Sequence, residues 1–91
     1  MPETVSRGDV SNLIKDAAFM VGACNTILDQ KGVLLIFKVG DIPEGQWPNF
    51  TIQVVSDFSK PREFQFTHDQ LLPTLSMALA LADILANRGG G

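Results

Sequence analysis

The hydrophobic pattern of this chain changes its period at Gly32, and this change constrains the fold more than any other feature. Before Gly32, apolar side chains recur every three or four residues, which is the spacing of one face of an α-helix. They are Val10, Leu13, Ile14, Ala17, Met20, Val21, Cys24, Ile27 and Leu28. We expect this helix to follow Gly8, with Asp9 as its cap, and to stop at Lys31-Gly32.

After Gly32, apolar and polar residues alternate, as they do in β-strands. The alternation predicts strands over residues 33–39 and 50–55 and a shorter strand over residues 63–66. The first strand is apolar on both faces, which favours a central position in the sheet over an edge. Connections of this length between strands fit an antiparallel meander.

A second helix is expected after the strands. Thr67 and Gln70 have the spacing of a capping box, and residues 74–87 are helical in pattern. Pro73 should bend or restart this helix. The predicted fold is α+β in the order α-β-β-β-α, a three-stranded antiparallel meander with two helices packed on one face. We expect a single domain over residues 9–88, with a flexible N-terminus at 1–8 and a flexible glycine tail at 89–91.

The last helix carries more apolar surface than such a fold needs. The chain has 91 residues, 45% hydrophobic and only 19% charged, whereas an average domain is about 25% charged. Twelve of the sixteen residues at 71–86 are apolar, and Asp83 is the only charged one. One broad stripe suits the core: Leu71, Leu72, Leu75, Ala78, Leu79, Ala82, Leu85 and Ala86.

A second stripe of this helix, formed by Met77, Leu81 and Ile84, falls on a different side. Packing against the first helix would absorb part of it. A second copy of the chain is the most economical partner for the rest, because twofold contacts bury like against like. Phe19, which projects from the polar face of the first helix, is expected to join this oligomer interface.

The loop at residues 40–49 is the most distinctive connection, because it is longer than a tight hairpin needs and holds the only tryptophan. Trp47 either folds over the sheet edge as a hydrophobic lid or contacts a partner, together with Ile42 and Glu44. In the second turn, Lys60 and Arg62 either grip an anion or are solvated charges that keep the sheet edge from pairing.

Composition argues against several function classes. Ten acidic and seven basic residues give a net charge of −3 and no basic patch for nucleic acid. One cysteine cannot form an internal disulfide, which favours the reducing cytoplasm. One histidine and no tyrosine leave few candidates for catalysis, and no Cys/His cluster suggests a metal or cofactor. No uninterrupted apolar run spans a bilayer, and the last helix lacks a basic polar face, so no membrane partner is expected.

The sequence therefore predicts a small, acidic, cytoplasmic interaction protein without enzymatic activity. It would act as a homo-oligomer, in the simplest case a dimer, and bind another protein as an inhibitor, adaptor or accessory factor. One alternative is a binder of a small anionic ligand or nucleotide at an oligomer interface, where Trp47 stacks and Lys60 or Arg62 pairs the charge. The second alternative is an enzyme whose site is shared between subunits, built from His68, Asp69 and Asp57.

Overall fold

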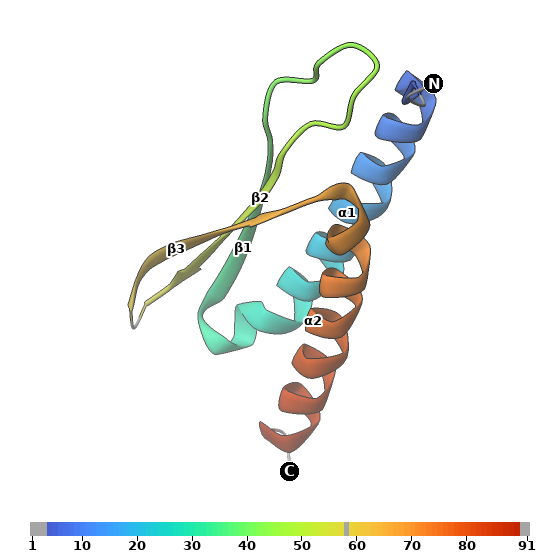
Figure 1. The fold of residues 1–91 in the computed structure, drawn as a ribbon. Coiled ribbons are helices and arrows are strands. Elements are labelled where there is room, and N and C mark those ends of the chain that lie inside the picture. Colours follow the sequence, from blue (N-terminus) through green and yellow to red (C-terminus); the bar gives the residue numbers. More distant parts are fainter. Residues whose placement is uncertain (1–3, 58, 90–91) are drawn as a thin grey trace.

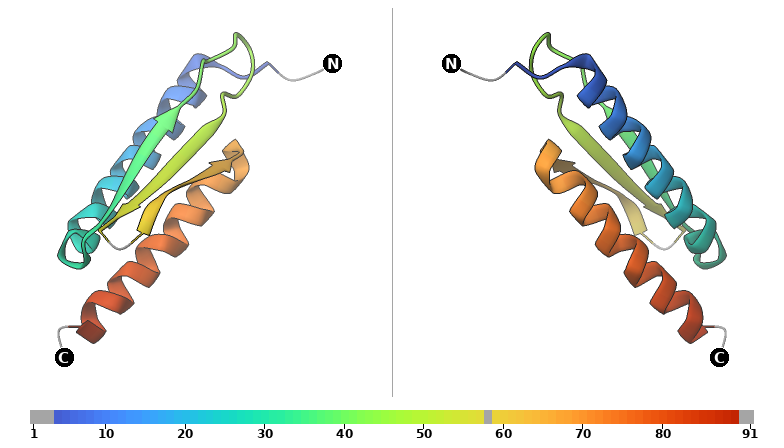
Figure 2. Two further views of the ribbon diagram at one scale, coloured as in Figure 1. Left: turned by 90° about the vertical axis from the view of Figure 1, so that its left-hand side faces the viewer. Right: turned by 90° about the vertical axis from the view of Figure 1, so that its right-hand side faces the viewer.

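The computed structural model describes residues 4–57 and 59–89 and confirms the predicted α+β fold. Its elements are α1 (Arg7–Leu28), the short 3-10 helix η1 (Asp29–Lys31), β1 (Val33–Val39), β2 (Phe50–Ser56), β3 (Ser59–Phe66) and α2 (His68–Gly89). The strands form an antiparallel sheet, and both helices lie side by side on one of its faces, running in the same direction (Figures 1 and 2). Of the flexible ends expected at residues 1–8 and 89–91, residues 1–3 and 90–91 lie outside the described residues.

The first helix begins earlier than the sequence pattern suggested. Its cap is Ser6, whose side-chain oxygen accepts a hydrogen bond from the Asp9 N–H at 3.1 Å, so the expectation that Asp9 is the cap was wrong. A serine hydroxyl reaches the N–H three residues ahead, and Gly8 is therefore part of the first turn. The predicted stop is confirmed, since Gly32 follows η1 in the left-handed conformation with φ of 71°.

The prediction that residues 33–39 form a central strand was wrong, because the sheet order is β1-β2-β3 and β1 is an edge. One apolar face of β1, including the buried Leu35, packs against the helices, while Leu34 on the other face is 48% exposed. The free edge of β1 is covered at one point by α1. Asn25 donates from Nδ2 to the Leu35 carbonyl at 2.9 Å and accepts from the Leu35 N–H at 2.7 Å.

The third strand is longer than predicted. It begins at Ser59, which pairs with Ser56, so Lys60 and Arg62 lie within an edge strand and not in a turn. A proline and three charged side chains, at positions 60–63, occupy this edge, and both features discourage pairing with another strand. The turn-like composition of this segment concealed its extended backbone.

The hydrophobic core lies between the helix pair and the sheet. Leu13, Ala17, Val21 and Cys24 of α1 meet Leu35, Phe50 and Ile52 of the sheet and Leu71 and Leu75 of α2. Among the described residues, no polar or charged side chain is buried. Burial raises the pKa of the Cys24 thiol, because desolvation disfavours the thiolate.

The second helix is continuous, so the expected restart at Pro73 does not occur. The missing N–H of Pro73 would have paired with the Asp69 carbonyl, and Asp69 is exposed to water near the start of the helix. The predicted capping contact from Gln70 is present, since its Oε1 accepts from the Thr67 N–H at 3.3 Å. The C-terminal end of α2 extends past the sheet and past the end of α1 (Figure 2).

The molecule is consequently elongated. It measures 54 × 24 × 16 Å, and its radius of gyration is 14.8 Å, compared with about 12 Å for a compact domain of this length. The C-terminal end of α2, which extends past the sheet and α1, contributes to this length (Figure 2).

Candidate functional site

The most prominent candidate surface is the side of α2 that faces away from the core. Met77, Leu81 and Ile84, which we call the outer stripe, are 67%, 54% and 53% exposed. They follow one another at steps of four and three residues, the spacing of a seam between two packed helices. Leu85, expected in the core stripe, is also 52% exposed, because α2 at this point has passed the sheet and α1.

Phe19 of α1 is the most exposed large apolar side chain among the described residues, at 78%. At about 100° per residue it lies opposite the buried residues of α1. Four predicted interface residues are thus exposed in a single chain, while the first stripe of α2 is largely buried or half-buried.

Over His68–Asn87 the same helix is long and apolar enough to cross a membrane, judged by length and composition alone. It is the one such helix in the described part of the chain. Internal packing covers one side of this segment, where Leu71, Leu75 and Ala82 are buried, and leaves the apolar outer stripe exposed. Asp69 and Asp83 interrupt the segment, and a charged side chain in the hydrocarbon region is costly. One such helix is weak evidence for a membrane protein.

The loop at residues 40–49 lies over one end of the core and is tied at both sides. The Gly40 N–H donates to the Asn49 carbonyl at 3.0 Å, and the Val5 N–H donates to the Gly45 carbonyl at 3.1 Å. Trp47 is half-buried against the hydrophobic core. Its ring also stacks on His68 at the start of α2, with ring centroids 4.4 Å apart and an angle of 6° between the planes.

His68 has a second neighbour, since its Nε2 lies 2.9 Å from Oδ1 of Asp69. Trp47, His68 and Asp69 therefore connect the loop to the N-terminal turn of α2. In this arrangement, one face of the indole ring is occupied by an internal contact, which reduces the area available for stacking a ligand.

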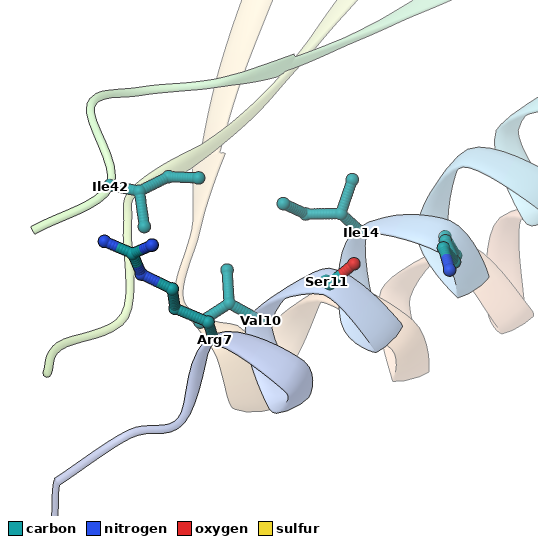
Figure 3. Close-up of a pocket in the computed structure, with 6 residues that line it drawn as sticks. Arg7, Val10, Ser11, Ile14 and Ile42 are labelled. Carbon is teal, nitrogen blue, oxygen red and sulfur yellow. The ribbon is translucent and has the colours of Figure 1, made fainter. Parts of the chain in front are cut away.

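Ile42 lies on the other side of the loop, 55% exposed, and faces α1. Between them is an open groove of about 540 Å³ lined by Arg7, Val10, Ser11, Ile14, Lys15 and Ile42 (Figure 3). We call it the α1–loop groove. A second hollow of about 240 Å³ shares Arg7, Val10 and Ile42 with it and continues along the loop past Glu44.

The predicted contact residues do not form one site within a single chain. Phe50, next to the loop, pairs with Phe66, whereas Ser56 at the far end of β2 pairs with Ser59. Six residues at about 3.3 Å each separate these ends by roughly 20 Å. Lys60 therefore lies at the opposite end of the sheet from Trp47, and Arg62 lies between, opposite Val54.

The residues of the enzymatic alternative are similarly divided. His68 and Asp69 are neighbours, while Asp57 lies at the hairpin end of β2, far from them. Within residues 4–57 and 59–89, no group of three or more His, Cys, Asp or Glu side chains could hold a metal ion.

Two features escaped the sequence analysis. Arg7 and Lys15 fall on one flank of α1, which the helical period could have revealed, but the loop residue opposite them depends on the path of the loop. The clamp between Asn25 and β1 has no signal in the sequence, because an asparagine beside an apolar stripe does not indicate its partner.

The fold and these surfaces define a two-helix, three-stranded α+β protein with an uncovered apolar helix face. Comparison with protein-family models, curated proteins and solved structures found no significant match.

Proposed function

We propose that this chain is a small, cytoplasmic, non-enzymatic interaction protein, an inhibitor, adaptor or accessory factor, that acts as a homo-oligomer joined through α2. The observation that supports the proposal is the exposure of the outer stripe, where three consecutive seam positions hold large aliphatic side chains. Monomeric proteins rarely leave such contiguous apolar surface open to water.

A second copy of the chain suits the outer stripe for two reasons. The seam spacing is compatible with the same stripe on a partner helix, so a twofold axis would bring like residues together. Ala80, which is exposed beside Met77 and Ile84, leaves room for a side chain from the other helix. The stripe contains no charge that two copies would bring into repulsion.

The expected affinity follows from the exposed fraction of these side chains. Full burial of a leucine, isoleucine or methionine contributes about 1.5–3 kcal/mol, so each half-exposed side chain contributes about 1 kcal/mol. Six side chains from two protomers give roughly 6 kcal/mol, and Phe19 would add to this. Association costs about 4–15 kcal/mol, so the outer stripe alone does not hold a stable dimer, and the contact must also cover the exposed side chains of Phe19 and Leu85.

The test is the mass in solution, measured by light scattering and sedimentation velocity up to about 200 µM, a concentration at which a dimer held by about 5 kcal/mol is substantially populated. We expect at least twice the 9.9 kDa of one chain. Leu81→Asp should return the protein to the mass of one chain, since a carboxylate in the seam is desolvated without a partner.

Two variants control this experiment. Ser76→Asp adds the same charge to the exposed polar line of α2 and should leave the oligomer unchanged. Leu75→Ala, at a side chain that is 1% exposed, should lower the free energy of unfolding by about 2–5 kcal/mol, whereas Leu81→Asp should lower it far less. A wild-type chain that stays monomeric, a Leu81→Asp variant that keeps the oligomer, or association only on phospholipid vesicles would each refute the proposal.

A further inference from the structure

The α1–loop groove combines an apolar floor with two cations, and nothing in the proposed self-association through α2 uses it. We propose that this groove binds an acidic, apolar peptide segment of a partner protein. Arg7 and Lys15 would pair with carboxylates of the segment, and its apolar side chains would lie on Val10, Ile14 and Ile42. The groove is at the N-terminal half of α1, away from the outer stripe, so this binding does not depend on the oligomer.

Charge is segregated around α1 in a way that favours an anionic ligand. At about 100° per residue, Arg7 and Lys15 fall on the groove side of the helix, and Asp9 and Asp16 fall on the opposite flank. The groove is therefore locally basic, although the whole chain carries a net charge of −3. The N-terminal turn of α1 adds the positive end of the helix dipole.

Neither cation forms an ion pair with another residue that the structure describes. The ion pairs of the described residues are Lys38 with Glu63 and His68 with Asp69, and neither includes Arg7 or Lys15. Both side chains are exposed at the groove. A guanidinium is suited to bidentate contact with a carboxylate, which makes Arg7 the principal anchor.

The apolar residues of the groove indicate that the ligand also carries apolar side chains. Val10 and Ile14 project from α1 toward the loop, and Ile42 projects from the loop toward Arg7 (Figure 3). Ile42 is 55% exposed, so a ligand gains free energy by covering it. Arg7 and Lys15 are eight residues apart on the helix, about 12 Å at 1.5 Å per residue, which leaves room for apolar side chains between two carboxylates.

The shape of the groove favours a peptide segment over a small molecule. Small-molecule sites usually enclose most of their ligand, whereas this groove is open and continues into the second hollow along the loop. Glu44 lies in that second hollow, so the acidic groups of the segment should lie over α1 and its neutral end near Glu44.

The experiment is an amide NMR titration of the full chain with a synthetic amphipathic peptide that presents two glutamates about 12 Å apart, flanking leucines, as α1 spaces its cations. We expect shift changes confined to α1 near Val10 and Ile14 and to the loop near Ile42. A matched peptide with glutamines in place of the glutamates should bind more weakly. Added salt should lower the affinity of the acidic peptide, because it screens the charge pairs.

Variants connect the binding to the two cations. Arg7→Gln and Lys15→Gln should each weaken binding about threefold and together about tenfold, as expected for exposed charge pairs. Ile42→Ser should also weaken it, while Lys31→Gln, outside the groove, should not. Circular dichroism of each variant verifies that the fold is retained.

The proposal is overturned if the acidic peptide causes no shifts in the groove, if the glutamine peptide binds equally well, or if the Arg7 and Lys15 variants bind as the wild type does. Stronger binding of octanoate than of the peptide would also overturn it, because that would indicate a small-molecule site. The titration is repeated with Leu81→Asp, so that failure of self-association does not affect its result.

Discussion

Replacement of Asn25 by alanine tests whether α1 fixes the free edge of β1. The Asn25 carboxamide makes two hydrogen bonds to one residue, accepting from the Leu35 N–H at 2.7 Å and donating to the Leu35 carbonyl at 2.9 Å. A neighbouring strand would satisfy these same groups. Both bonds are partly buried, so water replaces them only in part when the side chain is removed.

The magnitude follows from these contacts. A hydrogen bond contributes about 0.5–1.5 kcal/mol net, and a fully buried group left without a partner costs about 1–3 kcal/mol. Two partly buried bonds therefore give an expected loss of about 2 kcal/mol. For a chain of 91 residues, this loss lowers Tm by about 10 °C.

The assay is urea unfolding followed by circular dichroism, together with hydrogen exchange at the Leu35 amide. Thr26→Ala is the matched control, since Thr26 is the next residue on α1 and its Oγ1 makes an exposed bond to the Gly22 carbonyl at 3.0 Å. This control should cost no more than about 0.5 kcal/mol, as is usual for surface substitutions. Asn25→Ala should also accelerate exchange at Leu35.

The reasoning is refuted if Asn25→Ala loses no more stability than Thr26→Ala, or if the Leu35 amide remains equally protected. Either result would mean that β1 holds its position without the two hydrogen bonds from Asn25. If the reasoning is correct, the Asn25→Ala variant should also aggregate more readily than the wild type, since an apolar edge strand without its cover is a template for pairing.

The remaining predictions concern Cys24 and His68. Because burial raises the pKa of the Cys24 thiol, the unfolded chain ionises first as pH rises, so stability should fall above the usual thiol pKa, and urea unfolding should show this slope diminished in Cys24→Ala. A thiol reagent should label Cys24 only as fast as the chain opens, and rapid labelling of the folded protein would contradict its burial. His68→Ala removes the ring stacked on Trp47, so the Trp47 emission should shift to longer wavelength, whereas Gln65→Ala, at an exposed position of β3, should leave it unchanged.

Much of the fold was predictable because the signals for its helices and strands lie within short stretches of sequence. The helical period of α1, the alternation in β2 and the capping contact of Gln70 are all encoded within a few neighbouring residues. The wrong predictions concern segments whose sequence pattern is compatible with two local structures. Ser6 and Asp9 can each cap a helix, and the segment that holds Pro61 reads equally well as a turn or as an edge strand.

The position of β1 at the edge of the sheet was not predicted from its hydrophobic pattern. Leu34 and Leu35 are both apolar, and a strand with two apolar faces suggested burial on both sides. The meander places β2 between its neighbours, so the cover for β1 comes from Asn25 at the edge and from the helices on one face. The connection lengths, which already predicted a meander, require the first strand to be an edge, and they outweigh the apolar pattern of β1.

The exposed apolar face of α2 was also predictable only in part, because its extent depends on how α2 is placed relative to α1. The periodicity of α2 separated Leu75, which is buried, from Leu81, which is exposed, because these residues lie on different sides of the helix. It did not separate Leu75 from Leu85 within the broad core stripe, although at about 100° per residue Leu85 lies about 80° from Leu75 and only about 40° from Leu81. Leu85 is exposed because it lies beside Leu81 and because the C-terminal end of α2 extends past the sheet and α1 (Figure 2), whereas Ala82 is still buried. A helix that extends past its own core carries its core-facing stripe into solvent as well. An oligomer that covers Leu81 should therefore be tested for cover of Leu85, and Leu85→Asp should weaken the oligomer if the partner wraps the end of α2.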